Sequence, residues 1–192
     1  MVMSWILSAS IAAACVTAWP LGSPPQKDSD ARAALVHEAL GYKKLTLLHK
    51  DLREMDPFAA QMCAPASTAF GPHLAYMRNY VTPGALAKPL PKKGQLNLPL
   101  GTLIVKEKFE SKAGKEPTLI TAMKKTGKGV GAPAWTFVMI DMKTKKEVTN
   151  PKQPCLSCHK HWTANDGISD RGAALLKNWQ ETSSKNASES RQ

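Results

Sequence analysis

Residues 102–109 read Thr-Leu-Ile-Val-Lys-Glu-Lys-Phe, and this run predicts a β-strand. Apolar side chains recur at alternate positions, the period at which a strand turns its side chains to the same face. If only the face with Leu103, Val105 and Phe109 is buried, Lys106 lies in water. If a ligand lies against the opposite face, it lies beside Lys106. The two faces carry Leu103, Val105 and Phe109 on one side, and Ile104, Lys106 and Lys108 on the other.

Three more strands are predicted around this one. Residues 117–125 and 134–141 follow it, separated by a turn rich in glycine and lysine, and residues 73–81 precede it and end at a Thr-Pro-Gly turn. Consecutive strands joined by short turns pair in the antiparallel sense. The four strands therefore predict an antiparallel sheet.

Helices are predicted before and after the strands. Leucines at near-helical spacing over residues 30–52 indicate one helix, or two short ones because Gly41 weakens the middle. A C-terminal helix is predicted over residues 171–179, a loop over residues 54–73, and a loop or a short helix over residues 85–99. The predicted fold class is α+β, an antiparallel β-sheet with flanking helices.

The first 26 residues carry no charged side chain, which indicates a targeting segment followed by a linker. The alternatives are a segment that is retained as a membrane or lipid anchor, and a soluble N-terminal helix. A signal peptide or an anchor would place the protein in the periplasm or otherwise outside the cytoplasm. The expected organisation is a signal peptide over residues 1–18, a linker over 19–29, a folded domain over 30–180 and a disordered tail over 181–192.

The four cysteines fall into three groups. Cys15 leaves with the signal peptide, or carries a lipid if the segment is retained. Cys63 has no obvious partner, and is either a buried or free thiol or one end of an intermolecular bridge. Cys155 and Cys158 belong together, because residues 155–159 read Cys-Leu-Ser-Cys-His.

Three kinds of chemistry use a Cys-x-x-Cys-His segment. A zinc site needs about four ligands, and this segment supplies three. A redox disulfide needs a βαβ setting, which consecutive strands do not provide. Covalent haem fits best, because two thiols one helical turn apart reach the two vinyl groups of a porphyrin. We therefore expect one haem c per chain, attached to Cys155 and Cys158, with His159 as the axial iron ligand.

The opposite side of the iron would decide what such a haem does. A methionine or histidine ligand there would make an electron carrier, whereas an open position would bind gases or small substrates. His161 follows the axial ligand too closely to reach that side, and methionines in strands pack in cores more often than they bind metals. The remaining candidates are Met123, Met139, His49 and His73.

Several segments resemble the cytochrome P-460 family, and the resemblance spans residues 30–178. It implies an antiparallel sheet with flanking helices, one c-type haem and a homodimer. The segments, in chain order, are Gly71-Pro-His73, Tyr80-Val81, Gly101–Phe109, Thr121–Lys125, Trp135–Val138 and Cys155–His159.

The resemblance also implies roles for single residues. Cys155 and Cys158 correspond to the haem attachment points, and His159 corresponds to the proximal ligand. Lys106 occupies the position of a lysine that is covalently joined to the porphyrin in the hydroxylamine-oxidising members. Members of the cytochrome c′-beta type lack this link and bind nitric oxide or carbon monoxide at an open iron.

Other positions depart from the family's pattern. Arg78 stands one residue away from the family's distal arginine, a displacement that would turn its side chain to the opposite face of the strand. We keep Arg78 with Lys106 as a candidate catalytic residue. Glu107 and Glu110 are candidates for the carboxylate associated with hydroxylamine turnover, and residues 166–170 replace an Asp-Tyr-Val-Phe-like stretch.

These inferences predict an exported mono-haem c-type cytochrome that performs redox chemistry on hydroxylamine or nitric oxide at an open iron, and thus an oxidoreductase. One alternative is a non-catalytic protein that binds nitric oxide or carbon monoxide, as in the cytochrome c′-beta type. The other is a plain electron-transfer cytochrome c.

The chain carries 26 lysines and arginines against 15 acidic residues, a net charge of +11. Such a surface suits an acidic redox partner protein. No nucleic-acid-binding motif accompanies the charge, so we expect no nucleic-acid partner. The lysine-rich stretches 124–128 and 143–146 would either steer the partner or form ordinary solvated turns.

Overall fold

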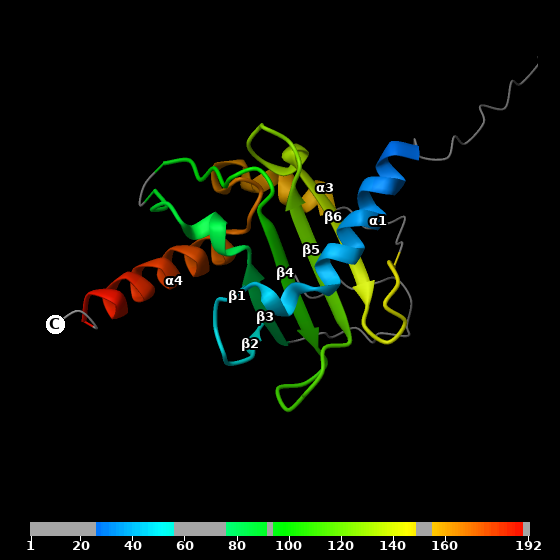
Figure 1. Ribbon diagram of the computed structural model, residues 1–192, viewed down its shortest axis with the longest axis horizontal. Helices are drawn as coiled ribbons and strands as arrows, with labels where there is room; N and C mark the ends of the chain where they lie inside the picture. The colour runs from blue at the N-terminus through cyan, green and yellow to red at the C-terminus, as the bar shows by residue number, and fades with distance from the viewer. Residues whose placement is uncertain (1–25, 56–75, 92–93, 149–154, 190–192) are drawn as a thin grey trace, which may run out of the picture.

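An antiparallel sheet forms the centre of the protein, in a computed structural model that describes residues 26–55, 76–91, 94–148 and 155–189 (Figure 1). Four long strands follow one another in sequence order, and two short strands both pair with the outer edge of the first long one. The long strands are β3 (Tyr76–Val81), β4 (Leu103–Phe109), β5 (Leu119–Lys125) and β6 (Trp135–Asp141), and the short ones are β1 (Thr46–Leu47) and β2 (Arg53–Glu54).

The α+β class and the antiparallel sheet predicted from the sequence are confirmed. The predicted strands over 102–109, 117–125 and 134–141 differ from β4, β5 and β6 by one or two residues at their starts. Of the strand predicted over 73–81, the structure describes the part from Tyr76 onward. Alternating apolar residues located these strands correctly because each of them packs on a helical layer.

The register of the strands assigns every side chain to one of two faces. Tyr80, Val105, Ala122 and Val138 lie side by side on what we call the α1 face. The next row, on the opposite or α4 face, consists of Val81, Ile104, Met123 and Phe137. Lys106 belongs to the α4 face, where its neighbours across the ladders are Asn79 and Thr121.

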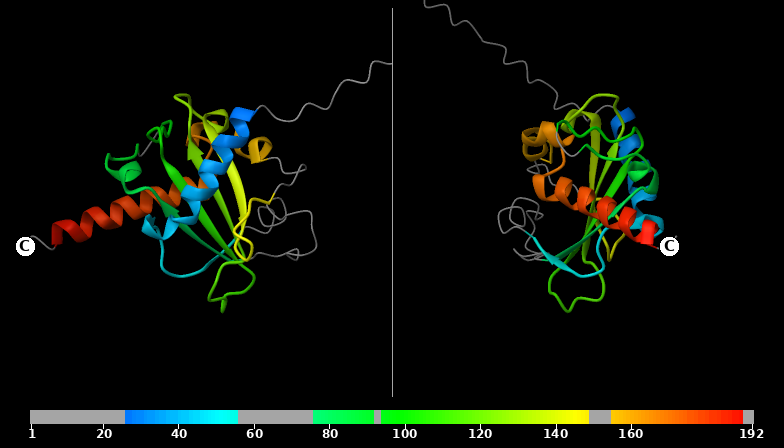
Figure 2. Two further views of the ribbon diagram at one scale, coloured as in Figure 1. Left: turned by 45° about the vertical axis from the view of Figure 1, so that its right-hand side comes forward. Right: turned by 90° about the vertical axis from the view of Figure 1, so that its left-hand side faces the viewer.

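Helix α1 (Gln26–Leu40) covers the α1 face, as the edge-on view in Figure 2 shows. The buried residues on its inner side pack against the strand residues of this face and close one of the hydrophobic cores. This core consists of Leu35, Ala39, Tyr42, Tyr80, Leu103, Val105, Ile120, Ala122, Val138 and Ile140.

One helix or two short ones were predicted over residues 30–52, and the structure has a helix and a short 3₁₀ helix on either side of Gly41 but no helix over the described residues 45–52. Helix α1 begins at Gln26, inside the expected linker, and ends before Gly41. A short 3₁₀ helix, η1 (Tyr42–Lys44), follows, and the chain then enters β1. Glycine is a poor helix former, and beyond it the backbone of Thr46–Leu47 gains ladder hydrogen bonds with β3 instead.

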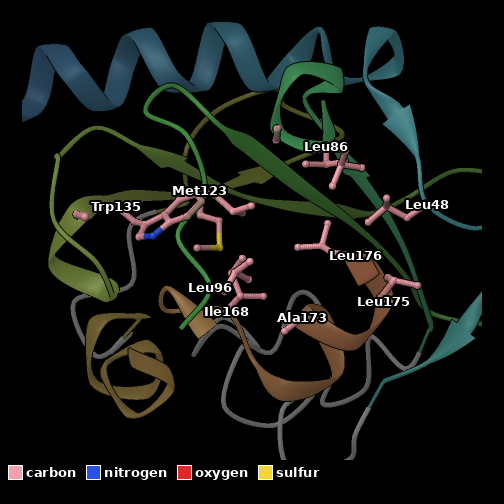
Figure 3. Packing of buried hydrophobic residues seen from close by; sticks show 13 residues of the cluster. Leu48, Leu86, Leu96, Met123, Trp135, Ile168, Ala173, Leu175 and Leu176 are labelled. Atoms are coloured by element: carbon pink, nitrogen blue, oxygen red, sulfur yellow. The ribbon is translucent and has the colours of Figure 1, made fainter. Parts of the chain in front are cut away.

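Helix α4 (Asp170–Glu189) packs its first turns under the opposite face, and Figure 3 shows its leucines pointing toward the sheet. Leu176 is 1% exposed, and burying a leucine of this kind contributes about 1.5–3 kcal/mol. Gln180 ties the helix to the η3 region (Pro83–Leu86), since its side-chain amide donates to the carbonyls of Leu86 at 3.0 Å and Lys88 at 2.8 Å.

Helix α4 is longer than predicted and projects from the sheet (Figure 1). The expectation of a disordered tail over 181–192 is wrong as far as Glu189. Polar hydroxyl side chains misled the prediction, because in the structure they bond back to the helix itself. Thr182 Oγ1 donates to the carbonyl of Asn178 at 2.9 Å, and Ser184 Oγ donates to the carbonyl of Gln180 at 2.8 Å.

Helix α3 (Cys155–His159) and the 3₁₀ segment η5 (Lys160–Asn165) lie on the same side of the sheet as α4 (Figure 2). Among the described residues, no helix combines the length and the apolar character that a membrane crossing would require. The expected signal peptide over 1–18, and with it Cys15, lies outside the described residues.

Candidate functional site

The two cysteines of the Cys-x-x-Cys-His segment lie on α3, three residues apart. Side chains at this spacing project from the same side of a helix. Both cysteines are half-buried, and no disulfide joins them to each other. Leu156, between them, is 54% exposed. The α3 segment therefore presents two thiols on one side, as attachment to a single flat group would require.

The ring of His159 is held by aromatic contacts and one hydrogen bond. Its centroid lies 4.7 Å from that of Phe137 on β6 and 5.4 Å from that of Trp162 on η5. Its Nδ1 lies 2.5 Å from the carbonyl oxygen of Gly167. A carbonyl can only accept, so Nδ1 carries the proton and donates it. This leaves the lone pair on Nε2, the arrangement in which imidazole binds a metal.

Burial also favours the neutral form of this imidazole. The pKa of His159 lies below its usual range, chiefly because burial disfavours the charged ring, and the positive charge of Lys106 lowers it further. The hydrogen bond to Gly167 opposes this shift without reversing it. Since a protonated ring cannot bind a metal through Nε2, these surroundings favour the ligand form of His159.

Lys106 lies on the face of the sheet that carries Phe137, and so on the side of His159. Its side chain is half-buried, and its charge acts on His159 as described above. The sequence left open whether Lys106 faces water or a covered surface. The α4 face is covered by the segment that contains His159, which places the two residues on one side of the sheet.

Asn79, opposite Lys106 in the β3–β4 ladder, was not predicted from the sequence. It is buried, with its side-chain amide nitrogen 3.3 Å from Nε2 of His49. His49 Nδ1 lies 2.7 Å from the carbonyl of Asp51, so both ring nitrogens of His49 have partners. Only the strand register reveals Asn79, because its place beside Lys106 depends on how β3 and β4 are aligned.

Arg78 lies on the α1 face, away from Lys106 and His159. Its Nε forms an ion pair with Oε2 of Glu107 at 3.0 Å, and its guanidinium carbon lies 4.9 Å from the centroid of the Phe109 ring. The alternation of side chains along β3 turns Arg78 to the face opposite Lys106. Arg78 lines a cationic pocket of about 660 Å³ together with Lys50, Lys112 and Lys115.

Glu107 also lies on the α1 face, and it is fully buried. Arg78 and Lys43 form ion pairs with its carboxylate, and the hydroxyls of Tyr42 and Tyr80 donate to it. Glu110 is exposed just after the end of β4. The structure therefore places Glu107 on the face opposite Lys106 and Glu110 outside the strand.

The other residues considered as ligands for the iron, where the structure describes them, are either buried in a core or exposed to solvent. Met123 is buried in the core under α4, and Met139 is buried beside Leu119. His161 is exposed. His73 and Cys63 lie outside the described residues, as do Gly71 and Pro72.

A buried indole N–H lies on the same face of β6, two positions before Phe137. Trp135 is 4% exposed, and its Nε1 has no hydrogen-bond partner. A buried donor without an acceptor costs about 1–3 kcal/mol. An acceptor group on a molecule bound against this face would remove that cost.

The turn after η5 is anchored in the interior. Lys125 Nζ lies 2.6 Å from Oδ2 of Asp166, with the two side chains 2% and 0% exposed. Lys124 is paired with Glu38, so neither lysine contributes to a free cationic surface over 124–128. Charge alone cannot predict this burial, which depends on an acidic partner far along the chain. The stretch 143–146 is exposed throughout.

The α3 segment and His159 fit a covalently attached haem: two thiols on one side of a short helix, then an imidazole with its Nε2 lone pair available. In the part of the chain that the structure describes, no group of three or more His, Cys, Asp or Glu side chains is arranged to hold a metal ion. Comparisons of the chain with known protein families, with curated proteins and with solved structures found no match.

Proposed function

We propose that the protein is an exported mono-haem c-type cytochrome of the cytochrome P-460 kind, which performs redox chemistry on small nitrogen species such as hydroxylamine or nitric oxide. The observation that carries this proposal is the hydrogen bond from Nδ1 of His159 to the carbonyl of Gly167. It fixes the tautomer and the orientation of the imidazole that directly follows Cys158, and it leaves Nε2 as a ligand.

The residues around the site have separate tasks in this proposal. Cys155 and Cys158 hold the haem by thioether bonds, and Phe137 and Trp162 keep the His159 ring from turning. A haem bound there would supply an iron that exchanges electrons with a small nitrogenous ligand. The Trp135 indole N–H offers a buried donor to an acceptor group on the cofactor.

Lys106 is the residue that would distinguish enzymatic members of this kind from gas binders. Its half-buried side chain faces the side of the sheet where His159 lies. A neutral amine is a nucleophile, and is therefore the form able to join a porphyrin. The crosslink proposed for Lys106 depends on this placement.

One observation favours the second candidate, a non-catalytic protein that binds nitric oxide or carbon monoxide. The neighbours of Lys106 in the sheet are Asn79 and Thr121, followed by Met139 on β6, and none of them is a carboxylate. Hydroxylamine oxidation releases protons, and a carboxylate near the substrate would accept them. Glu107, the closest acidic residue in sequence, lies on the opposite face.

An acidic redox protein is the proposed partner, and the exposed lysines of the 143–146 stretch are its proposed contact. Electrons taken from the substrate have to leave the site, and complementary charge speeds such encounters. A homodimer and a periplasmic location are part of the same proposal.

The test is production of the chain in a host that matures c-type haem, followed by intact mass and absorption spectra. We expect one covalent haem per chain, loss of that mass in Cys155→Ala/Cys158→Ala, and no loss in the control Cys63→Ala. A ferrous protein that binds carbon monoxide would exclude a six-coordinate electron carrier. Hydroxylamine turnover with an artificial electron acceptor then separates the enzyme from the gas binder. A mature chain without added haem mass would disprove the proposal.

A further inference from the structure

A buried ion pair lies directly behind the proximal side of the proposed site. Lys125, the last residue of β5, is 2% exposed, and Asp166, in the turn after η5, is fully buried. Their charged atoms are 2.6 Å apart. Because desolvation of two charges largely cancels their attraction, a buried pair contributes little net stability. The role of this pair in the protein is to hold neighbouring segments in place.

Asp166 binds three separate segments through its two carboxylate oxygens. Oδ2 accepts from Lys125 Nζ and from the backbone N–H of Leu98 at 2.8 Å. Oδ1 accepts from the backbone N–H of Gly131 at 3.0 Å. Lys125 Nζ in turn donates to Oδ1 of Asn97 at 2.6 Å. One carboxylate therefore fastens the turn to the end of the sheet and to the loops on either side.

The turn itself has an unusual backbone conformation. Asp166 has φ +57° and Gly167 has φ +77°, both in the left-handed region. A Cβ on Gly167 would lie 2.9 Å from the backbone nitrogen of Ala132, so this glycine packs directly against the loop that Asp166 also binds. Its N–H donates to the carbonyl of Trp162 at 2.8 Å. Asp166 and the N–H of Gly167 are both held by these hydrogen bonds, and the Gly167 carbonyl points toward Nδ1 of His159.

We propose that Asp166 and Lys125 are positioning residues for the proximal ligand: they hold the Gly167 carbonyl so that it keeps the His159 imidazole in the Nδ1–H tautomer and sets the basicity of Nε2. A fixed acceptor at Nδ1 increases electron donation from the ring to a bound metal. The effect on iron rests on the proposed function, whereas the hydrogen bond and its anchor belong to the chain alone.

The experiment compares the wild type with Asp166→Asn, with the neutral pair Lys125→Met/Asp166→Asn, and with the control Lys124→Met. Lys124 is the neighbour of Lys125 on the other face of β5, paired with Glu38 near the surface. Circular dichroism checks that each variant is folded. The double variant leaves no unpaired buried charge, and so provides a folded comparison if the single substitution prevents folding.

The first readout needs no haem. In ¹⁵N-histidine NMR spectra of the chain made without haem maturation, we expect the Nδ1–H tautomer and a slowly exchanging Hδ1 for His159. Both Asp166 variants should exchange this proton at least about tenfold faster, and Lys124→Met should not. A wild-type His159 protonated on Nε2 alone, or Asp166 variants with unchanged exchange, would overturn the proposal.

The second readout uses the haem-loaded protein. The iron–histidine stretching band of the ferrous form should move to lower frequency in the Asp166 variants, and the reduction potential should become more positive. Unchanged values in folded, haem-loaded variants would also overturn the proposal. If the wild type carries no haem mass, the proposed function fails, while the NMR measurement still decides whether Asp166 positions His159.

Discussion

Lys106 and His159 lie on the same side of the sheet, close enough for the ammonium charge of Lys106 to lower the pKa of the His159 imidazole. They are far apart in sequence, one on β4 and the other at the end of α3. The proposed crosslinking lysine and the proposed axial ligand thus lie on one side of the sheet.

The crosslink predicts a spectral change on substitution of Lys106. If Lys106 is joined to the porphyrin, the main band of the ferrous protein lies at clearly longer wavelength than in an ordinary c-type haem, and Lys106→Ala abolishes the shift. Absorption spectra and the mass of haem peptides measure this. Lys112→Ala, in the exposed loop between β4 and β5, is the control. A spectrum unchanged by Lys106→Ala would rule out the link and favour the gas-binding alternative.

Glu107 is predicted to serve stability rather than the haem site. Removal of its charge in Glu107→Gln weakens contacts with Lys43, Arg78 and the two tyrosines, and should lower the free energy of unfolding by about 1–3 kcal/mol. Urea unfolding measures the loss. The exposed Glu110→Gln is the matched control, with an expected change below about 0.5 kcal/mol. A haem spectrum altered in folded Glu107→Gln would contradict the placement of Glu107 on the α1 face.

The same cluster predicts a loss of stability at alkaline pH. Burial raises the pKa of Tyr42 and of Tyr80, and Glu107 adds to both shifts. Burial acts to lower the pKa of Lys43, but its bonds to Glu107 and Tyr80 outweigh this and raise it. Each group holds its proton more tightly when folded, so the stability it contributes is present below its unfolded pKa of about 10–10.5 and is lost as pH rises through the folded pKa.

Unfolding by urea at pH 8 and at pH 11 tests this dependence. We expect a smaller loss between the two pH values in Tyr42→Phe than in the wild type, because phenylalanine does not ionise. Tyr76→Phe, at the start of β3, serves as the control and should behave like the wild type. Equal losses in Tyr42→Phe and the wild type would show that Tyr42 does not contribute.

Gly167 is predicted to tolerate no side chain. Gly167→Ala would bring a Cβ to 2.9 Å from the Ala132 nitrogen at a positive φ, which should cost about 1–3 kcal/mol and disturb the His159 hydrogen bond. Gly129→Ala, where a Cβ would meet nothing within 4 Å, is the control and should leave stability and haem incorporation unchanged. Thermal unfolding and haem content measure both, and a wild-type result for Gly167→Ala would refute the close packing of this turn.

The sequence was sufficient to predict the long strands and the antiparallel sheet, because alternation reports directly on which residues are buried. It was insufficient for features that depend on register or on distant partners. Asn79 beside Lys106 follows from the alignment of β3 with β4. The buried state of Lys125 follows from its pairing with Asp166, which no local pattern announces.

Element ends were also difficult to predict, for a different reason. At Gly41 a weak helix former competes with a strand partner that is distant in sequence, so the leucine spacing beyond it was misread as helix. In residues 181–189 the polar composition indicated disorder. In the structure this segment is helical, and hydroxyl groups donate hydrogen bonds to backbone carbonyls of the same helix.

The margins of the sheet bear on how a second copy of the chain could associate with the first. The outer backbone of β3 is already engaged by β1 and β2, and the N–H of Leu48 donates to the carbonyl of Asn79 between them at 2.9 Å. At the outer edge of β6, the backbone of residues 146–148 forms hydrogen bonds with the strand. The N–H of Asp141 donates to the carbonyl of Lys146, and the N–H of Val148 donates to the carbonyl of Met139. Lateral addition of a strand at β3 is thereby blocked. A homodimer that uses side-chain surfaces rather than the β3 edge should separate into subunits without any change in sheet content.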